Sequence, residues 1–311
     1  MTEASGTVFK NFRKDNFKAF ELLILPFVFV VVLFATLNAS LPIYILGQLC
    51  GIVFFVQCFI LLHEFGHGAF FKSQRMNAIF GSIFSLFVLI PFYNWKKIHH
   101  LHHKWTGWRD KDPTTEKTFA DRFSAKQIKL IDFCWRYNIP LFTLGYRFGI
   151  YWKAEKLKRH LNAQEYRICI NSMITYGAIY TALIFFYGST LVLLLPAMYF
   201  AFVITDVISL SQHSSIAIPV SGGKEVKPLP FGKQSQYSRS LVFPPMFSKY
   251  VLFNFNFHEV HHAYPCLSCY HIGNVKIPVT NSFEGFSLAR KVKRMSGFEF
   301  IFTSSPDRKG F

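Results

Sequence analysis

Two long stretches without a charged residue constrain this chain of 311 residues most strongly. No Asp, Glu, Lys or Arg occurs in residues 22–63 or in residues 168–205. Each stretch is far longer than the roughly 20 apolar residues that one membrane crossing needs. Each is also interrupted near its middle by residues typical of a turn, around Ser40 and Gly188. The pattern therefore predicts two transmembrane hairpins, with spanning helices at about 20–37, 42–62, 168–187 and 191–210.

The distribution of charge predicts how these helices are oriented. The chain has 34 Lys and Arg residues and a net charge of +17, which alone is compatible with nucleic-acid binding. On the predicted topology, however, every Lys and Arg lies on one side of the membrane. The positive-inside rule then makes both termini and the loop between the hairpins cytoplasmic, in a bacterial inner membrane or the endoplasmic reticulum. We attribute the charge to topology and anionic lipids, and expect no nucleic acid as a partner.

Other apolar segments are expected to lie on the membrane surface. Residues 78–92 are too short for a crossing, and residues 241–257 contain two prolines and a lysine. Residues 119–160 mix aromatic and basic side chains, which is typical of helices at the lipid headgroups. Residues 1–19 are polar and basic and do not read as a cleaved signal peptide. We expect one domain over residues 1–311, an all-α integral membrane protein with four transmembrane helices in two hairpins and a cytoplasmic helical cap.

Nine of the twelve histidines form three short groups. The first is HEFGH, with His63 and His67 at the cytoplasmic end of the second spanning helix. The second is HHLHH at residues 99–103, and the third is HEVHH at residues 258–262. Side chains at positions i and i+4 of a helix are neighbours about 5–6 Å apart, so two imidazoles can bind one ion. The spacing HxxHH puts three imidazoles on one face, where they can bridge two ions.

The number of histidines predicts two metal ions in the cap. Imidazole binds zinc, copper, iron and nickel, but eight histidines exceed the roughly three or four protein ligands of one zinc ion. His100 is rotated about 100° from His99 around a helix and is the expected non-ligand, although a set of His99, His100 and His103 also fits. The candidate metal ligands are His63, His67, His99, His102, His103, His258, His261 and His262.

The first group also matches HExxH, the motif of zinc metalloproteases, including intramembrane ones. In that remote alternative Glu64 is the general base and Asp206 a third ligand. The other two histidine groups then have no explanation.

The motifs HEFGH, HHLHHKWTG and NFNFHEVHHAYP resemble the three histidine boxes of the membrane fatty-acid desaturase superfamily, in the same order and with the same hairpin placement. The resemblance implies two iron ions (Fe²⁺) held by the boxes, with no catalytic residue separate from the metal ligands. It also implies one further ligand between the last helix and the third box, where His213 lies. An asparagine that contacts a metal through water is also implied, and Asn254 is the candidate.

A member of this superfamily is expected to use O₂ as co-substrate and to remove two hydrogens from a lipid acyl chain, which leaves a cis double bond. The sequence contains no haem, flavin or iron–sulfur motif, so we expect a separate electron donor, a ferredoxin or small cytochrome. A lipid or carotenoid hydroxylase or ketolase on the same di-iron scaffold inserts oxygen instead. The boxes alone do not separate these reactions.

Metal-bound imidazoles are normally oriented by a second hydrogen-bond partner. Asp206 stands out because it follows an otherwise charge-free helix. His160 and His271 lie outside the boxes and are expected not to bind metal. The candidate orienting groups are Glu64, Asp110, Asp112, Asp206 and Glu259.

Overall fold

The computed structural model describes residues 12–275 and 281–303. These residues form a mostly helical protein, in which three helices are long and apolar enough to cross a membrane. They are α2 (Asn16–Ala35), α3 (Leu41–Gly66) and α9 (Ala163–His213). All three coincide with the charge-free stretches of the sequence. Most of the polar segment that precedes α2, residues 1–11, lies outside the described part of the chain.

The first charge-free stretch folds as a helical hairpin. The Asp15 carboxylate caps α2 by accepting a hydrogen bond from the Phe17 amide. The helix ends at Thr36, whose hydroxyl donates to the Val32 carbonyl at 2.8 Å. Helix α3 begins at Leu41 with a proline in its first turn, where a missing N–H leaves no helical hydrogen bond unmade. The two helices then pack along each other.

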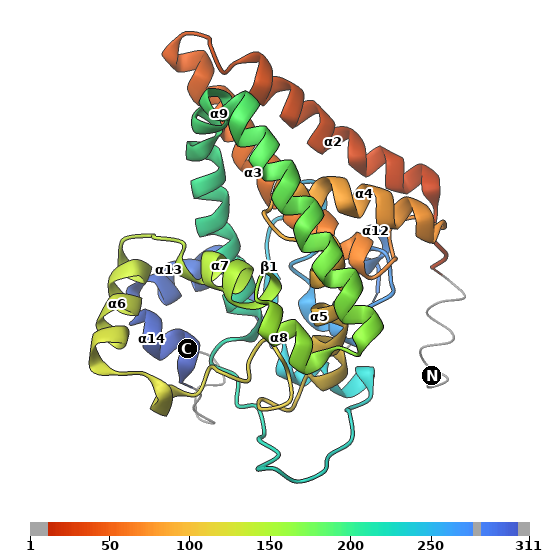
Figure 1. Ribbon diagram of the computed structural model, residues 1–311, viewed down its shortest axis with the longest axis vertical. Coiled ribbons are helices and arrows are strands. Elements are labelled where there is room, and N and C mark those ends of the chain that lie inside the picture. Colours follow the sequence, from red (N-terminus) through yellow and green to blue (C-terminus); the bar gives the residue numbers. More distant parts are fainter. Residues whose placement is uncertain (1–11, 276–280, 304–311) are drawn as a thin grey trace.

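The second charge-free stretch forms one bent helix. α9 has 51 residues, and at about 1.5 Å per residue a straight helix of this length measures roughly 77 Å, more than twice the ~30 Å of a bilayer core. The bend falls at Tyr187, where φ −132° and ψ 22° leave the helical region. We expected a turn at residues 187–190, whereas one residue makes the break. The two legs of α9 diverge from the end of the molecule that also holds the α2–α3 turn (Figure 1).

Gln48 of α3 fastens this helix to the second leg of α9. Pro196 lies inside that leg and cannot donate a backbone hydrogen bond. The Gln48 side-chain amide donates to the Leu193 carbonyl at 3.2 Å, and its oxygen accepts from the Ala197 amide at 2.9 Å. In an uninterrupted α-helix, the Ala197 amide would donate directly to the Leu193 carbonyl. Gln48 therefore satisfies both groups beside the proline and fixes the position of α3 against α9.

Replacing Gln48 by leucine is expected to destabilise the protein. The substitution roughly conserves volume, but it leaves the buried Ala197 amide without this acceptor and the Leu193 carbonyl with one donor fewer, at a cost of roughly 1–3 kcal/mol. Thermal unfolding in detergent measures the effect. Tyr44→Phe removes only a second donor to the Leu193 carbonyl and is the control, with a smaller drop in Tm. An unchanged Tm for Gln48→Leu would contradict this role.

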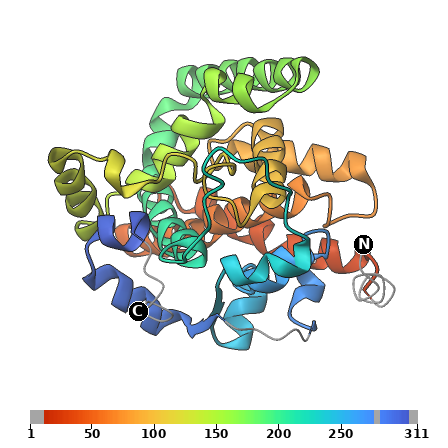
Figure 2. The same cartoon turned by 90° about the horizontal axis from the view of Figure 1, so that it is seen from below.

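Shorter helices form a cap, most of which lies at the end of the molecule away from the two bends (Figure 1). Residues 78–92, expected not to cross the membrane, contribute to the 13-residue helix α4. The cap consists of α4 (Gln74–Leu86), α5 (Phe92–Trp105), η1 (Ala120–Arg122), α6 (Ala125–Arg136), α7 (Leu141–Tyr146), η2 (Arg147–Tyr151), α8 (Ala154–His160), η3 (Phe231–Lys233), η4 (Ser235–Tyr237), α10 (Pro245–Tyr250), α11 (His258–Ala263), α12 (Cys269–Ile272), α13 (Gly285–Arg294) and α14 (Gly297–Phe302). Seen from below, α13 and α14 (blue) lie beside α6 (Figure 2), against which both pack.

The prediction of an all-α chain was wrong in one detail, because the cap contains a small sheet. β1 (Ser240–Val242) pairs in parallel with β2 (Ser282–Glu284). The Glu259 carboxylate joins this pair to α11, since it accepts from the Ser240 amide at 3.3 Å and from the Asn281 amide at 3.1 Å. Three-residue strands are too short to show the alternation that identifies a strand in a sequence.

Large apolar side chains are exposed along the three long helices. Val31 of α2 is 66% exposed, Leu41 of α3 is 69% exposed, and Phe185 of α9 is 80% exposed. Soluble proteins rarely expose continuous apolar surface of this extent. These faces are therefore the ones expected to contact lipid.

Candidate metal centre

The first histidine box lies at the end of α3, where α5 passes close by. A Cβ atom added at Gly66 would lie 2.2 Å from the Trp95 ring of α5. Only glycine permits this approach. Trp95 in turn stacks on His99, with ring centroids 4.1 Å apart. The glycine of the HEFGH motif therefore brings the second box against the first.

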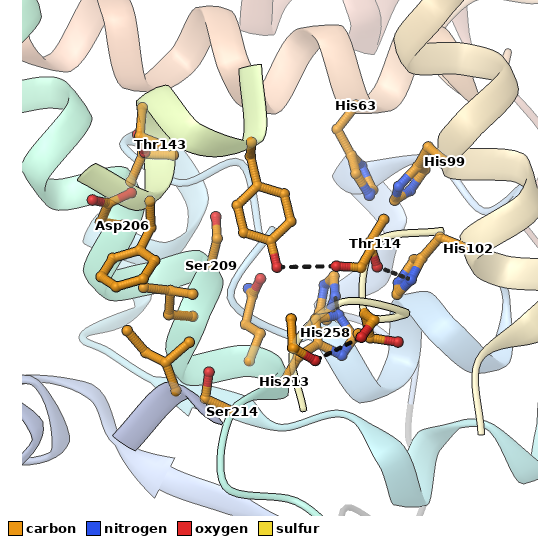
Figure 3. Close-up of a pocket in the computed structure, with 18 of the residues that line it drawn as sticks. His63, His99, His102, Thr114, Thr143, Asp206, Ser209, His213, Ser214 and His258 are labelled. Atoms are coloured by element: carbon orange, nitrogen blue, oxygen red, sulfur yellow. Dashed lines mark hydrogen bonds between the residues drawn. The ribbon is translucent and has the colours of Figure 1, made fainter. Parts of the chain in front are cut away.

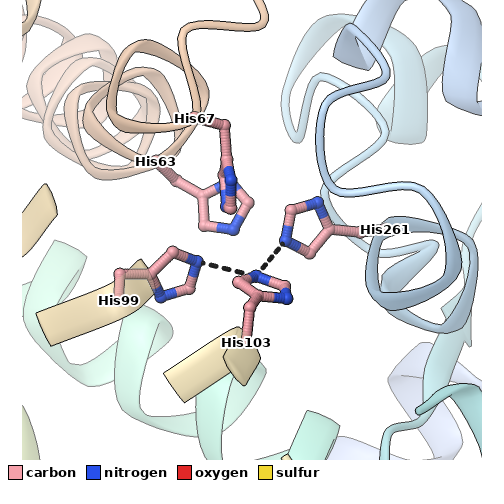
Figure 4. A group of neighbouring side chains, drawn as sticks. All are labelled: His63, His67, His99, His103 and His261. Carbon is pink, nitrogen blue, oxygen red and sulfur yellow. Dashed lines mark hydrogen bonds between the residues drawn. The ribbon is translucent and has the colours of Figure 1, made fainter. Parts of the chain in front are cut away.

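Five imidazoles from α3, α5 and α11 converge (Figure 4). The His103 Nε2 atom lies 3.1 Å from His99 Nε2 and 3.0 Å from His261 Nε2. One nitrogen from each of the five lies within 4.8 Å of the others. The five-histidine group consists of His63, His67, His99, His103 and His261.

A second group lies beside the first and includes the histidine at the end of α9. One nitrogen each of His102, His213 and His262 lies within 4.8 Å of the others. His258 joins them, since its Nε2 atom is 2.8 Å from His213 Nε2. The four-histidine group therefore consists of His102, His213, His258 and His262. It contains the one candidate ligand outside the three boxes.

The spacing of these nitrogens fits metal ligation. Two imidazole nitrogens bound to one ion at about 2.1 Å and at right angles are roughly 3.0 Å apart. The closest pairs here lie 2.8, 3.0 and 3.1 Å apart. In addition, the buried Nε2 atoms of His63, His67 and His262 have no hydrogen-bond partner in the described part of the chain. Buried polar atoms rarely lack a partner, and a metal ion in each group would supply one.

Hydrogen bonds to Nδ1 turn the Nε2 atom of several rings toward its group. Asp112 lies 2.6 Å from His102 Nδ1, so His102 has the carboxylate partner that we expected to orient a metal-binding imidazole. His213 Nδ1 lies 3.3 Å from the Tyr237 carbonyl, and His262 Nδ1 lies 3.4 Å from the Gln234 amide oxygen. Each contact fixes the ring and leaves Nε2 for a metal.

Gln234 and Tyr237 were not predicted from the sequence. The buried Gln234 side chain also donates to the His103 carbonyl at 2.7 Å, so it joins the second box to the third. Both residues lie between α9 and β1, in a segment without a motif. Only the folded chain brings them to the histidines, and we see no signal in the sequence that identifies them.

Asp112→Asn is expected to weaken metal binding in the four-histidine group. The amide has a similar size but lacks the negative charge that supports His102, and loss of such a partner typically costs roughly 10–100-fold in metal affinity. Chelator titration of anaerobically purified protein measures this. Asp110→Asn is the matched control, because Asp110 accepts hydrogen bonds from the Ser221 amide and hydroxyl instead. Equal metal retention by the two variants would contradict the assignment.

Glu64 and Asn254 both bind the backbone of Cys269. The buried Glu64 carboxylate accepts from the Cys269 amide at 2.9 Å and lies 3.3 Å from His63 Nδ1. Asn254 has a φ of 59°, a left-handed conformation that asparagine tolerates, and it donates to the Cys269 carbonyl at 2.9 Å. The two side chains thus connect α3 and the segment before box three to α12.

Asp206 and Glu259 hold backbone segments near the histidines. Asp206 accepts hydrogen bonds from the Phe142 and Thr143 amides, in the first turn of α7, where such donors lack helical partners. Glu259 joins α11 to β1, as described above. Neither carboxylate belongs to the histidine groups themselves.

The other histidines of the described residues lie outside both groups. His100 is exposed on α5. His160 lies 3.2 Å from the Glu116 carboxylate, and a ring nitrogen of His271 lies 2.9 Å from the Arg13 carbonyl.

Burial favours the neutral form of six imidazoles in the two histidine groups. It is the main reason why the pKa of His67 is lowered to about 3, and the nearby His100, His102 and Lys96 contribute to the same shift. Burial and neighbouring imidazoles hold the pKa of His99, His103, His258, His261 and His262 well below the ordinary value. Neutral imidazole is the form that binds metal.

The metal-free protein is therefore expected to lose stability as the pH falls. In the unfolded chain these histidines titrate near pH 6.5, whereas in the folded protein they do so only at much lower pH. Below about pH 6.5 the unfolded state binds more protons, so the free energy of unfolding decreases. Unfolding of metal-stripped protein at pH 5 and pH 7 tests this. Equal stability at the two pH values would contradict it, and His67→Gln should reduce the difference.

A cavity of about 180 Å³ adjoins both groups (Figure 3). His63 and His99 of the five-histidine group contribute to its wall, together with His102, His213 and His258 of the four-histidine group. At the far end from His99 and His102 lie Asp206 and Thr143 (Figure 3). The apolar lining of the cavity includes Phe59, Ile90, Trp95, Phe142, Leu210, Phe255 and Ile301.

Apolar helices of membrane-spanning length and two buried histidine groups beside a cavity define the class, a membrane protein with a metal-binding histidine centre. Residues 39–283 match the family described as fatty acid desaturase. This match covers most of the chain, which therefore belongs to the fatty acid desaturase family. The resemblance of its histidine motifs to that superfamily is confirmed.

Named relatives are desaturases of acyl lipids. The chain is 26% identical over 253 residues, 74% of its length and 61% of the relative's, to the acyl-lipid omega-3 desaturase (cytochrome b5) of the endoplasmic reticulum of Arabidopsis thaliana. It is 31% identical over 114 residues, 35% of its length and 24% of the relative's, to the chloroplastic sn-2 acyl-lipid omega-3 desaturase (ferredoxin) of Helianthus annuus. It is 31% identical over 123 residues, 38% and 33% of the two lengths, to the sn-1 acyl-lipid omega-3 desaturase (ferredoxin) of Nostoc sp. (strain 36). The chain spans less than two thirds of the length of each of these relatives.

Proposed function

We propose that this protein is an O₂-dependent fatty acyl desaturase that introduces a cis double bond into a lipid acyl chain. The observation that supports this most directly is the cavity whose wall contains imidazoles of both histidine groups. An acyl chain in that cavity lies beside both metal positions at once, and the apolar wall holds it there while excluding water. Membership of the fatty acid desaturase family supports the same reaction.

Each histidine group holds one iron ion in this proposal. Imidazole is a suitable ligand for iron, and burial favours the neutral form of most of these rings. The two irons, when bound, supply the activation of O₂ and the oxidation of an unactivated C–H bond. The net reaction removes two hydrogens from adjacent methylenes, consumes one O₂, two electrons and two protons, and releases two water molecules.

Residues around the groups position the ligands. Asp112 orients His102, and Glu64 orients His63. Glu259 and Asp206 act through the backbone, Glu259 by fixing α11 to β1 and Asp206 by fixing α7 beside the cavity. The water-mediated metal contact of Asn254 stays a prediction.

The substrate is an acyl lipid, and the electrons come from a separate protein. The relatives' names specify acyl lipids, with cytochrome b5 in one and ferredoxin in others. The net charge of +17 favours an acidic donor through electrostatic attraction.

The chain crosses the membrane four times, through α2, α3 and the two legs of α9. The turn before α3 and the bend at Tyr187 face one side, and the cap faces the other. Because Lys and Arg are absent from both charge-free stretches, the positive-inside rule makes the cap cytoplasmic. The zinc protease alternative has little support, since Glu64 is engaged by Cys269 and His63.

Lipid analysis of a host that expresses the protein tests the proposed reaction. Wild-type protein is expected to yield acyl chains two mass units lighter, because two hydrogens are lost. His261→Ala should abolish the product, since it removes a ligand of the five-histidine group. His100→Ala, which changes an exposed neighbour of that group, should keep it.

Indistinguishable lipid profiles for wild type and His261→Ala, with iron and a donor present, would contradict the proposal. A gain of sixteen mass units would instead indicate a hydroxylase on the same scaffold.

A further inference from the structure

A buried guanidinium in the wall of the cavity has one donor without a partner. Arg147 begins η2 and is 3% exposed. Its Nε donates to the Val88 carbonyl at 2.6 Å and its Nη1 to the Thr143 carbonyl at 3.0 Å. Its Cζ lies 4.2 Å from the centroid of the Phe202 ring. The Nη2 atom is buried and has no acceptor within residues 12–275 and 281–303.

An unpaired donor of this kind is unfavourable unless a ligand completes it. Leaving a buried charged group short of an acceptor costs more than leaving a neutral one, and the three contacts of Arg147 prevent Nη2 from turning away. Arg109, in the same wall, differs: its Nη2 donates to the Thr118 and Phe302 carbonyls. Arg147 is therefore the guanidinium whose hydrogen bonding suggests a bound molecule.

Arg147 lies at the end of the cavity away from the metals. It binds Thr143, which Figure 3 places with Asp206 opposite His99 and His102. It also stacks on Phe202, which precedes His213 by eleven residues on α9. At about 1.5 Å per residue, this is roughly 16 Å along the helix from the four-histidine group.

We propose that Arg147 Nη2 binds the carbonyl oxygen of the substrate's acyl ester or thioester. The inference rests on the proposed desaturase function. The methyl end of an acyl chain offers no acceptor to Nη2, whereas the carbonyl end does. Because the Asp206 carboxylate already acts on the charge of Arg147, a neutral acceptor is favoured over the carboxylate of a free fatty acid.

Lipids with and without the carbonyl test the contact. Purified, iron-loaded protein is given a phosphatidylcholine with an acyl ester and the matched phosphatidylcholine with an alkyl ether, which lacks only the carbonyl oxygen. Wild type should bind the ether roughly 10-fold or more weakly, as expected for loss of a buried hydrogen bond to a charged donor. Arg147→Met should bind both lipids equally, whereas Arg122→Met, a change at an exposed arginine, should behave as wild type. Binding is measured by protection against thermal unfolding, which needs no turnover.

The outcomes separate this inference from the proposed reaction. Equal binding of ester and ether by wild type would overturn the role of Arg147. A preference for the ester without any desaturated product would leave the role intact and contradict the reaction instead. If Arg147→Met does not fold, the binding of the ester and the ether by wild type still shows whether the carbonyl oxygen contributes to binding. A parallel arm with the acyl-coenzyme A thioester identifies which carbonyl source binds more tightly.

Discussion

Imidazole nitrogens that face one another across about 3 Å in a dry interior are the constraint on which the structure depends. The rings do not satisfy one another, since the buried Nε2 atoms of His63, His67 and His262 have no hydrogen-bond partner among the described residues. A metal ion at the centre of each group would bind the nitrogens that now lack a partner. The histidines of the two groups come from α3, α5, α9 and α11, so these four helices must pack together at the site. Several contacts around the histidines hold the helices in this arrangement. Gly66 admits Trp95 between α3 and α5, while Gln48 ties α3 to the kinked leg of α9.

Much of this arrangement could be predicted from the sequence, because its strongest signals are local. The absence of charge over residues 22–63 and 168–205 identifies the long helices, and the spacing of His63 and His67 identifies a ligand pair. The division of the histidines between the two groups could not be predicted. His102 and His103 are adjacent, as are His261 and His262, yet each pair is split between the two groups. Neighbouring residues point about 100° apart on a helix, so their partners depend on how α5 and α11 face each other.

The contacts that orient the rings were harder still to predict. Asp112 was one of five acidic candidates, and its 2.6 Å contact with His102 distinguishes it. Gln234 and Tyr237 carry no pattern at all, because a long connection after α9 brings them to the histidines. The bend of α9 at Tyr187 and the three-residue strands were missed in detail for a related reason, since each involves too few residues to leave a periodic signal.

The cavity joins two environments that an acyl substrate needs at the same time. One end is lined by imidazoles of both groups, and the other holds the buried Arg147 and Asp206. Charged groups are costly to bury in an apolar setting, so a polar part of the substrate is expected to bind at the end that holds Arg147 and Asp206. A chain that binds by a polar end at Arg147 presents its methylenes to the metals.

X-ray absorption at the metal edge of anaerobically purified protein tests the central claim most directly. Two irons that share the nine imidazoles of the two groups predict a sulfur-free ligand shell with between four and five imidazoles per iron. A shell with sulfur ligands, or with only one or two imidazoles per metal, would contradict the account.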